Sequence, residues 1–122
     1  MRRTILILGT MVVMLVVAGG VAFALQCGGG TCLGTEAGED IQGTDTDETI
    51  FGFGGNDKIW GNGGGDVIDG GEGNDNLNGG PGDDSLHGGP GDDYFAGGEG
   101  YDECWGEAGT DTTDGSCETW VP

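Results

Sequence analysis

The nine residues GGEGNDNLN, Gly70–Asn78, contain the pattern on which most of the chain is built. Glycine occupies places one, two and four, an acidic residue place six and a large aliphatic residue place eight. The pattern returns at once as GGPGDDSLH, Gly79–His87, and again as GGPGDDYFA, Gly88–Ala96. A fixed period of this kind is typical of solenoids, and it predicts the fold before any argument from local propensity.

The register extends in both directions from Gly70 without an insertion, giving nine units over residues 34–114. The units begin at Gly34, Gly43, Gly52, Gly61, Gly70, Gly79, Gly88, Gly97 and Gly106. Place six carries Glu39, Glu48, Asp57, Asp66, Asp75, Asp84, Asp93, Asp102 and Asp111. Place eight carries Ile41, Ile50, Ile59, Ile68, Leu77, Leu86, Phe95, Cys104 and Thr113. Composition alone, with 31 glycines in 122 residues, would predict disorder, but a register this strict argues against it.

Charge restricts the class of partner. The chain has 22 acidic residues and three basic ones, Arg2, Arg3 and Lys58, for a net charge of −19. A nucleic-acid-binding role is excluded because such a chain would repel the phosphates that it must neutralise. Cations are the partners that this composition predicts.

The N-terminus has the features of an export segment. Arg2 and Arg3 precede an uncharged apolar run that ends in the small-x-small triplet Ala22-Phe23-Ala24. This arrangement predicts a signal peptide over residues 1–24. Because the apolar run is longer than a usual signal-peptide core, an uncleaved membrane anchor is the alternative. Both versions place the acidic part outside, so we expect a secreted, extracellular protein or a membrane-anchored one with the repeats outside.

Four cysteines lie in two pairs near the ends of the exported part: Cys27 with Cys32, and Cys104 with Cys117. If the repeats stack into a rod, the two ends are too far apart for the Cα separation of about 7 Å that a disulfide allows. We therefore expect Cys27–Cys32 and Cys104–Cys117 disulfides, formed in an oxidising compartment. A zinc site is the alternative, although no Cys-x-x-Cys motif occurs. Residues 25–33 and 115–122 are assigned as the N-terminal and C-terminal caps.

Each unit is too short for a long strand but long enough for a turn followed by a three-residue strand. The side chain at place eight then points inward between mostly polar neighbours. Turn, strand and turn in succession make a coil that stacks on the next one through parallel pairing. The sequence predicts an all-β solenoid whose inward stripe runs from Ile41 to Phe95.

The turns have the chemistry of a hard-cation site. Glycine-rich segments expose successive backbone carbonyls around a carboxylate, and oxygen ligands in flexible geometry suit calcium. Zinc and copper would want nitrogen or sulfur ligands, which the turns lack. The alternative is that these aspartates are solvated turn formers, a common role for Asp. Strict repetition of the acid favours the metal.

The unit resembles the hemolysin-type, or RTX, nonapeptide GGxGxDxUx, with Gly54–Ile59 and Glu72–Leu77 as the closest stretches. The resemblance implies a parallel β-roll, β-helix-like, in which two nonapeptides form one coil. It implies calcium between units n and n+2, held by carbonyls at places one and three and by the aspartate at place six, with about five ions in all. The implied metal residues are Asp57, Asp66, Asp75, Asp84, Asp93, Asp102 and Asp111. The first two units depart from the pattern, with Glu39 and Glu48 at place six, and are interpreted as a cap with weak calcium binding.

A calcium-dependent fold follows from the scarcity of large apolar side chains. Few such residues offset the entropy of ordering a glycine-rich chain, and the acidic turns repel one another. We expect an exported calcium-binding module, disordered without calcium and without catalytic activity. The single histidine, His87, is interpreted as a surface residue. The alternative is a calcium-stiffened adhesion or matrix protein that binds a glycan or cell-surface partner through outward aromatic residues, Phe51, Trp60 and Trp105.

Overall fold

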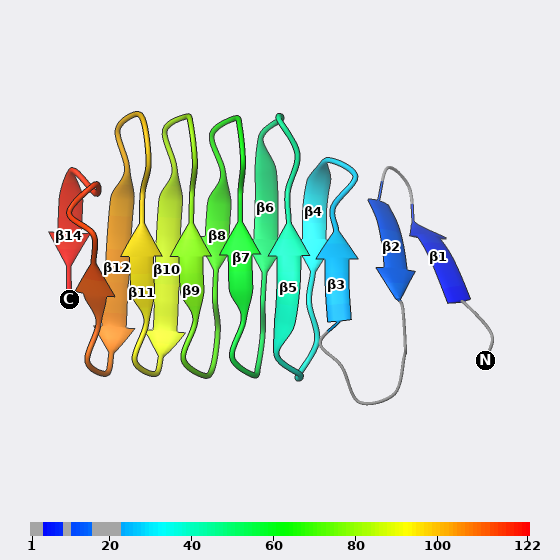
Figure 1. Cartoon of the computed structure of the whole chain (residues 1–122), viewed down its shortest axis with the longest axis horizontal. Coiled ribbons are helices and arrows are strands. Elements are labelled where there is room, and N and C mark those ends of the chain that lie inside the picture. Colours follow the sequence, from blue (N-terminus) through cyan, green and yellow to red (C-terminus); the bar gives the residue numbers. More distant parts are fainter. Residues whose placement is uncertain (1–3, 9–10, 16–22) are drawn as a thin grey trace.

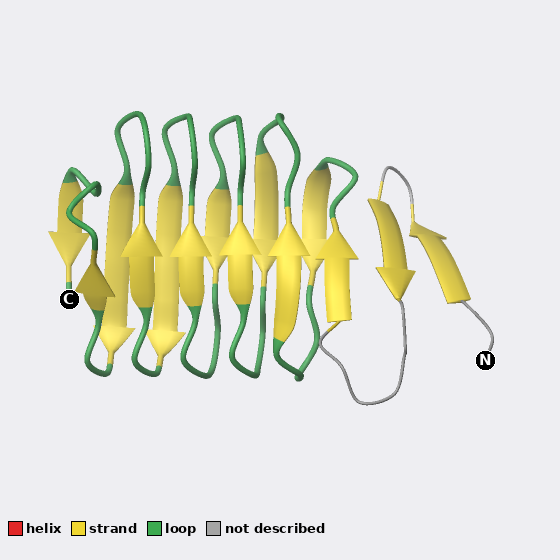
Figure 2. Cartoon of the chain, in the orientation of Figure 1, coloured by secondary structure: helices red, strands yellow, loops and turns green. Residues whose placement is uncertain are grey.

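The computed structural model describes residues 4–8, 11–15 and 23–122, and every regular element within them is a β-strand. Most strands belong to two parallel six-stranded sheets that form the two walls of a roll (Figures 1 and 2). One wall contains β3 (Phe23–Gln26), β5 (Glu39–Gln42), β7 (Lys58–Trp60), β9 (Asn76–Asn78), β11 (Tyr94–Ala96) and β13 (Thr112–Thr113). The other contains β4 (Gly30–Leu33), β6 (Glu48–Phe51), β8 (Val67–Asp69), β10 (Ser85–Pro90), β12 (Glu103–Ala108) and β14 (Thr119–Val121). We call them the odd sheet and the even sheet.

Consecutive strands alternate between the sheets, so one coil of the roll uses two nonapeptide units. Lys58 pairs with Asn76 in the odd sheet and Val67 with Ser85 in the even sheet, each eighteen residues apart. A shift of one residue would turn every place-eight side chain from the core to solvent, so the core fixes this register. The prediction of a parallel β-roll with two units in each coil is confirmed.

The core is a single file of side chains from each sheet. The seven apolar residues predicted to point inward have no solvent-exposed surface: Ile41, Ile50, Ile59, Ile68, Leu77, Leu86 and Phe95. Leu25 pairs with Ile41 and Cys32 with Ile50, which extends both files into the predicted N-terminal cap. The places on either side of this file lie on the outer surface, as alternation along a strand requires.

Disulfides close the two ends of the core. Cys27 bonds to Cys32, with their Cα atoms 5.5 Å apart, and Cys104 bonds to Cys117, with theirs 6.0 Å apart. The predicted connectivity is confirmed, and no free cysteine remains among the described residues. Trp120 packs its ring edge-on against Phe95, with centroids 5.2 Å apart, and so covers the last coil.

The predicted export segment is described in part. β1 (Thr4–Leu8) and β2 (Met11–Leu15) pair as an antiparallel hairpin that forms a sheet of its own, and β2 lies next to β3 and β4 at the end of the roll. Arg2, Arg3 and the alanine at position 22 lie outside the described residues. The predicted cleavage point after Ala24 falls inside β3. In the described part of the chain, no helix has the length and apolar character to cross a membrane.

Candidate metal centre

The place-six carboxylates form two columns, one along each series of turns that leads into a sheet. In each column the backbone N–H of one acid donates to a carboxylate oxygen of the acid one coil further on, so Asp57 N bonds to Asp75 Oδ1 at 2.8 Å. The first column contains Glu39, Asp57, Asp75, Asp93 and Asp111. The second contains Glu48, Asp66, Asp84 and Asp102. The columns bring together acids that are eighteen residues apart in sequence.

The second carboxylate oxygen of most of these residues is buried without a partner. Their side chains are at most 3% exposed, and their Oδ2 atoms accept no hydrogen bond. The aspartates concerned are Asp57, Asp66, Asp75, Asp84, Asp93 and Asp102. A buried, unsatisfied carboxylate oxygen is costly, since its desolvation is not repaid. Six such atoms at equivalent places indicate a missing positive ligand rather than a defect of packing.

Glycine at place one makes room for that oxygen. A Cβ atom added to Gly70 would lie 2.5 Å from Asp75 Oδ2, and one added to Gly52 would lie 2.5 Å from Asp57 Oδ2. Glycines at places two and four have a different function, because there the chain turns through positive φ, as at Gly71 (90°) and Gly73 (119°). The repeat therefore needs its three glycines for two separate reasons.

Burial makes these carboxyls weaker acids than usual. Desolvation, partly offset by the amide bond that each accepts and increased by neighbouring carboxylates, raises the pKa of Asp57, Asp75 and Asp84 to about 7. The same causes raise the pKa of Asp66 and Asp93 to about 6, and the pKa of Asp102 in the same direction. A nearby cation would remove this penalty by favouring the charged form.

The turns fit a hard cation that takes ligands from the backbone. Among the described residues, no three His, Cys, Asp or Glu side chains come close enough to hold one ion, so most ligands would be carbonyl oxygens. The place-three carbonyls of Pro90 and Glu99 each accept one amide, at 3.0 and 2.7 Å. A carbonyl has two lone pairs, so each of them can accept a second partner. Carbonyl and carboxylate oxygens in flexible loops are the ligand set of calcium.

A comparison with family models identifies this repeat. The model of the RTX calcium-binding nonapeptide repeat matches residues 33–68, 42–77 and 69–104, which together cover more than half of the chain. The chain belongs to this family. No curated protein and no solved structure matches it. The resemblance inferred from Gly54–Ile59 and Glu72–Leu77 is confirmed, and the repeats are calcium-binding repeats.

The first two RTX units replace glycine with threonine around a glutamate. Thr44 and Thr46 donate their hydroxyls to Glu48, the second at 2.6 Å, and Thr35 donates its hydroxyl to Glu39. Together with the amide of Thr44, the hydroxyls of Thr44 and Thr46 satisfy both carboxylate oxygens of Glu48. In Glu39 only Oε1 has a partner, and Oε2 is buried without one, like the Oδ2 atoms of the later units. The second turn therefore has the least need of a cation, which is consistent with weak calcium binding there.

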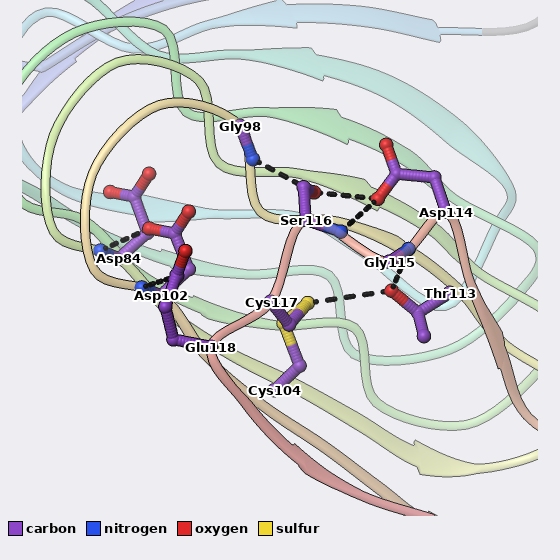
Figure 3. The surroundings of a disulfide bond; sticks show 10 residues. All are labelled: Asp84, Gly98, Asp102, Cys104, Thr113, Asp114, Gly115, Ser116, Cys117 and Glu118. Carbon is purple, nitrogen blue, oxygen red and sulfur yellow. Dashed lines mark hydrogen bonds between the residues drawn. A yellow bond between two sulfur atoms is a disulfide. The ribbon is translucent and has the colours of Figure 1, made fainter.

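The last RTX unit also departs from the others. Asp111 accepts the amide of Asp93 at 2.9 Å but is only half-buried, and its Oδ2 is not among the orphaned atoms. In the second column, Glu118 takes the terminal position and accepts the amide of Asp102 at 2.7 Å, beside the Cys104–Cys117 disulfide (Figure 3). Sequence reasoning missed Glu118 because it lies sixteen residues from Asp102, out of register.

A second set of ladders runs along place five and was also missed. Asn74 N donates to Asn56 Oδ1 at 2.8 Å, and Asp92 N donates to Asn74 Oδ1 at 2.9 Å. Here the side chain accepts from the following coil, whereas at place six it accepts from the preceding one. The available signal was the frequency of Asn and Asp at place five, since these side chains readily accept backbone amides.

The outward aromatic residues do not form one surface. Phe51 and Trp105 lie in the even sheet, whereas Trp60 lies in the odd sheet, and all three are half-buried. His87, between Phe51 and Trp105 in the even sheet, stacks on Trp105 with ring centroids 4.5 Å apart.

His87 also lies between a hydroxyl and a carboxylate. Its Nε2 is 3.4 Å from Ser85 Oγ, and its Nδ1 is 3.6 Å from Glu107 Oε1. Ser85, His87 and Glu107 thus lie in the order of a nucleophile, a base and an acid. Hydrolysis also needs free N–H donors that stabilise the oxyanion. β10 is paired on both sides and the amide of Ser85 bonds to Asp66, so the strand offers no such donors.

Proposed function

We propose that this chain is an exported, non-enzymatic module that binds calcium in its RTX turns and folds when calcium arrives. The observation that carries the proposal is the set of six buried Oδ2 atoms without partners. In a chain of net charge −19, such atoms make the folded state unfavourable until a cation neutralises them.

The residues proposed to hold calcium are those predicted from the repeat. Asp57, Asp66, Asp75, Asp84, Asp93 and Asp102 would supply Oδ2, with carbonyls at places one and three of the turns as neighbours. Asp111, at the open end, would bind more weakly. When bound, calcium supplies positive charge at the points where the columns concentrate carboxylates. The chain contributes the register that holds these oxygens in place, so binding and folding are coupled.

Such coupling suits an exported protein. Extracellular calcium modules bind at roughly 10⁻⁴–10⁻³ M, so their sites stay empty in a low-calcium cytosol and fill outside. We propose that the chain stays unfolded before export and forms its roll afterwards. The two disulfides support this location, because disulfides persist in oxidising compartments.

Isothermal titration calorimetry of the full chain with calcium tests the proposal. About five ions should bind with a negative heat-capacity change, since folding buries apolar surface. Magnesium at the same concentrations should not reproduce the folding heat, because it prefers rigid octahedral sites. Absence of calcium binding at about 10 mM, well above the range for extracellular modules, would contradict the proposal.

An adhesive role is the second candidate, and the His87–Trp105 stack on the even sheet favours it. Under this proposal the calcium-bound roll presents aromatic residues to a glycan or cell surface. Trp105→Ala would then reduce surface binding without changing the calcium titration, whereas Trp60→Ala, on the opposite sheet, would serve as the matched control.

A further inference from the structure

A hollow of about 370 Å³ opens on the outside of the roll, where the even sheet meets the turns that lead into the odd sheet. Its lining includes Glu36, Phe51, Phe53, Asp69, Glu72 and Pro90. Phe51 and Asp69 come from strands β6 and β8 and Pro90 from the end of β10, whereas Glu36, Phe53 and Glu72 come from successive turns of the same series. None of these side chains belongs to the place-six columns, although the place-three carbonyls of Glu72 and Pro90 are among the proposed neighbours of calcium, so the hollow lies next to the proposed calcium sites on the outer side of the turns.

A glycine in the second of the four turns positions one carboxylate of this hollow. Place three of the four turns carries Glu36, Gly54, Glu72 and Pro90 in order, and only Gly54 has no side chain. A Cβ added to Gly54 would lie 2.6 Å from Glu36 Oε2, so the glutamate folds across the vacant place. Glu36 and Glu72 therefore line the hollow from the turns on either side of Gly54, and Gly71 lies beside them in the lining.

Aromatic rings form one wall. Phe51 and Phe53 stack with centroids 6.1 Å apart and planes inclined by 24°. Phe53 is 46% exposed and has a φ of 74°, whereas the next unit in the same series of turns has Gly71 at this place. A bulky residue in left-handed conformation is strained, and such strain persists mainly where it serves a function. Place two takes the same conformation at Asn62 (71°) and Glu107 (77°), but only at Phe53 does it carry an aromatic ring, and this ring leaves nearly half of its surface open to an external contact.

Carboxylates form the other wall. Glu36 and Glu72 are exposed, Asp69 is half-buried, and no cationic side chain lines the hollow. Within the described residues these acids are too widely spaced to hold one metal ion together. An extended organic cation can instead reach the carboxylates at one end and lie against the rings with its body.

We propose that this hollow binds an arginine side chain from a basic segment of a partner protein. A guanidinium is planar, stacks on aromatic rings and bonds carboxylates through two N–H groups at once, all of which the hollow offers. The surrounding charge of −19 attracts a basic segment before contact. This inference goes beyond the proposed function because it assigns a partner to the outer face of the folded roll, and it rests on that function only in that calcium folds the chain.

NMR titration of the isotope-labelled full chain in calcium, under conditions where its amide signals are dispersed, tests the proposal. The probes are Nα-acetyl-arginine amide and its neutral isostere, Nα-acetyl-citrulline amide. Arginine should shift the amides of Phe51, Phe53 and Glu72 saturably, and citrulline should not. Equal shifts with both probes, or shifts spread evenly over all acidic turns, would overturn the proposal.

Matched variants separate the hollow from general charge. Glu72→Gln should weaken arginine binding roughly two- to fivefold, while Glu99→Gln, the same change at the same place of a unit in the other series of turns, should leave it within error. Phe53→Gly should weaken it by a similar factor without loss of fold, because glycine accepts the φ of 74°. Tyr101→Ala, which removes an exposed ring elsewhere, is its control. Equal losses in Glu72→Gln and Glu99→Gln would overturn the proposal. It would also be overturned if the hollow took Lys58 from a second copy of this chain, which would appear as a calcium-dependent dimer that Lys58→Gln abolishes.

Discussion

Asp57 donates its backbone amide to Oδ1 of Asp75 at 2.8 Å, while Oδ2 of Asp75 is buried without a partner. One carboxylate oxygen thus fixes the spacing of two coils and the other is left for a cation. The same division recurs along both columns, so the structure of the roll and its proposed calcium binding depend on the same side chains.

Asp75 lies in the middle of its column and should take part in two calcium sites. We expect Asp75→Asn to lower the calcium affinity of those sites roughly tenfold or more, since it removes the anionic oxygen and keeps the size of the side chain. Asp40→Asn, an equal change of charge on the outer face of β5, is the control. Calorimetric titration of both variants measures the difference, and equal isotherms would be inconsistent with the assignment of Asp75.

Glu39 provides the opposite test within the same column. Its Oε2 is buried without a partner, as Oδ2 of Asp75 is, but its side chain is one methylene longer and its turn has Ala37 instead of glycine at place four, so we expect a poorer calcium site. We expect Glu39→Gln to leave the calcium stoichiometry and affinity nearly unchanged in the same titration. A loss as large as that of Asp75→Asn would show that the first units bind calcium as the later ones do.

Acidification should stabilise the roll in the absence of calcium. The pKa values of Asp57 and Asp75 are about 7 in the folded chain, against 3.8 when unperturbed, so the folded chain holds these protons more tightly. Their contribution to stability is then fully present below about pH 4 and is lost as the pH rises through 7. Thermal melts in chelator should show higher melting temperatures or more strand signal at pH 5 than at pH 8.

Calcium should reverse this dependence. Protons and calcium compete for the same Oδ2 atoms, so calcium affinity should fall as the pH drops below about 7. Titrations at pH 8, 6.5 and 5.5 measure the trend. A calcium affinity that stays constant over this range would mean that the buried carboxylates are not the ligands.

Place-one glycine should be required for the cation site itself. The Cβ of Gly70→Ala would collide with Asp75 Oδ2, and overpacking of this kind costs about 1–3 kcal/mol. Gly63→Ala, whose Cβ would lie 3.3 Å from its nearest neighbour, is the milder control. We expect Gly70→Ala to lower both the melting temperature in calcium and the calcium affinity, and Gly63→Ala to affect both much less.

The disulfide at the C-terminal end should stabilise the roll more than the one at the N-terminal end. Cys104 and Cys117 are separated by 13 residues and Cys27 and Cys32 by 5. From loop-closure entropy we expect losses of about 3 and about 2 kcal/mol when each pair is replaced by serine. Denaturant unfolding in saturating calcium compares the two double variants, and a larger loss at the N-terminal pair would contradict this order.

The core and the columns could be predicted because a strict period fixes both. An apolar residue at place eight, such as Ile59, and an acid at place six, such as Asp57, recur every nine residues. This spacing assigns the first to a core-facing strand position and the second to a turn. Leu25 and Glu118 lie outside the period, and only the path of the chain brings them into line with it.

The opposite directions of the two ladders could not be predicted either. Asn74 and Asp75 are adjacent and chemically similar, yet Asn74 accepts from the following coil and Asp75 from the preceding one. The direction depends on backbone geometry within the turn, which residue type does not reveal. The hollow beside Phe53 likewise depends on which turns lie next to each other, eighteen residues apart in sequence.

Calcium-dependent folding can be measured by circular dichroism of the full chain, titrated with calcium from a chelated start at pH 8. We expect a largely disordered spectrum in chelator and a cooperative gain of strand signal at roughly 10⁻⁴–10⁻³ M calcium, reversed by added chelator. A strand spectrum that is the same with chelator and with calcium would contradict it.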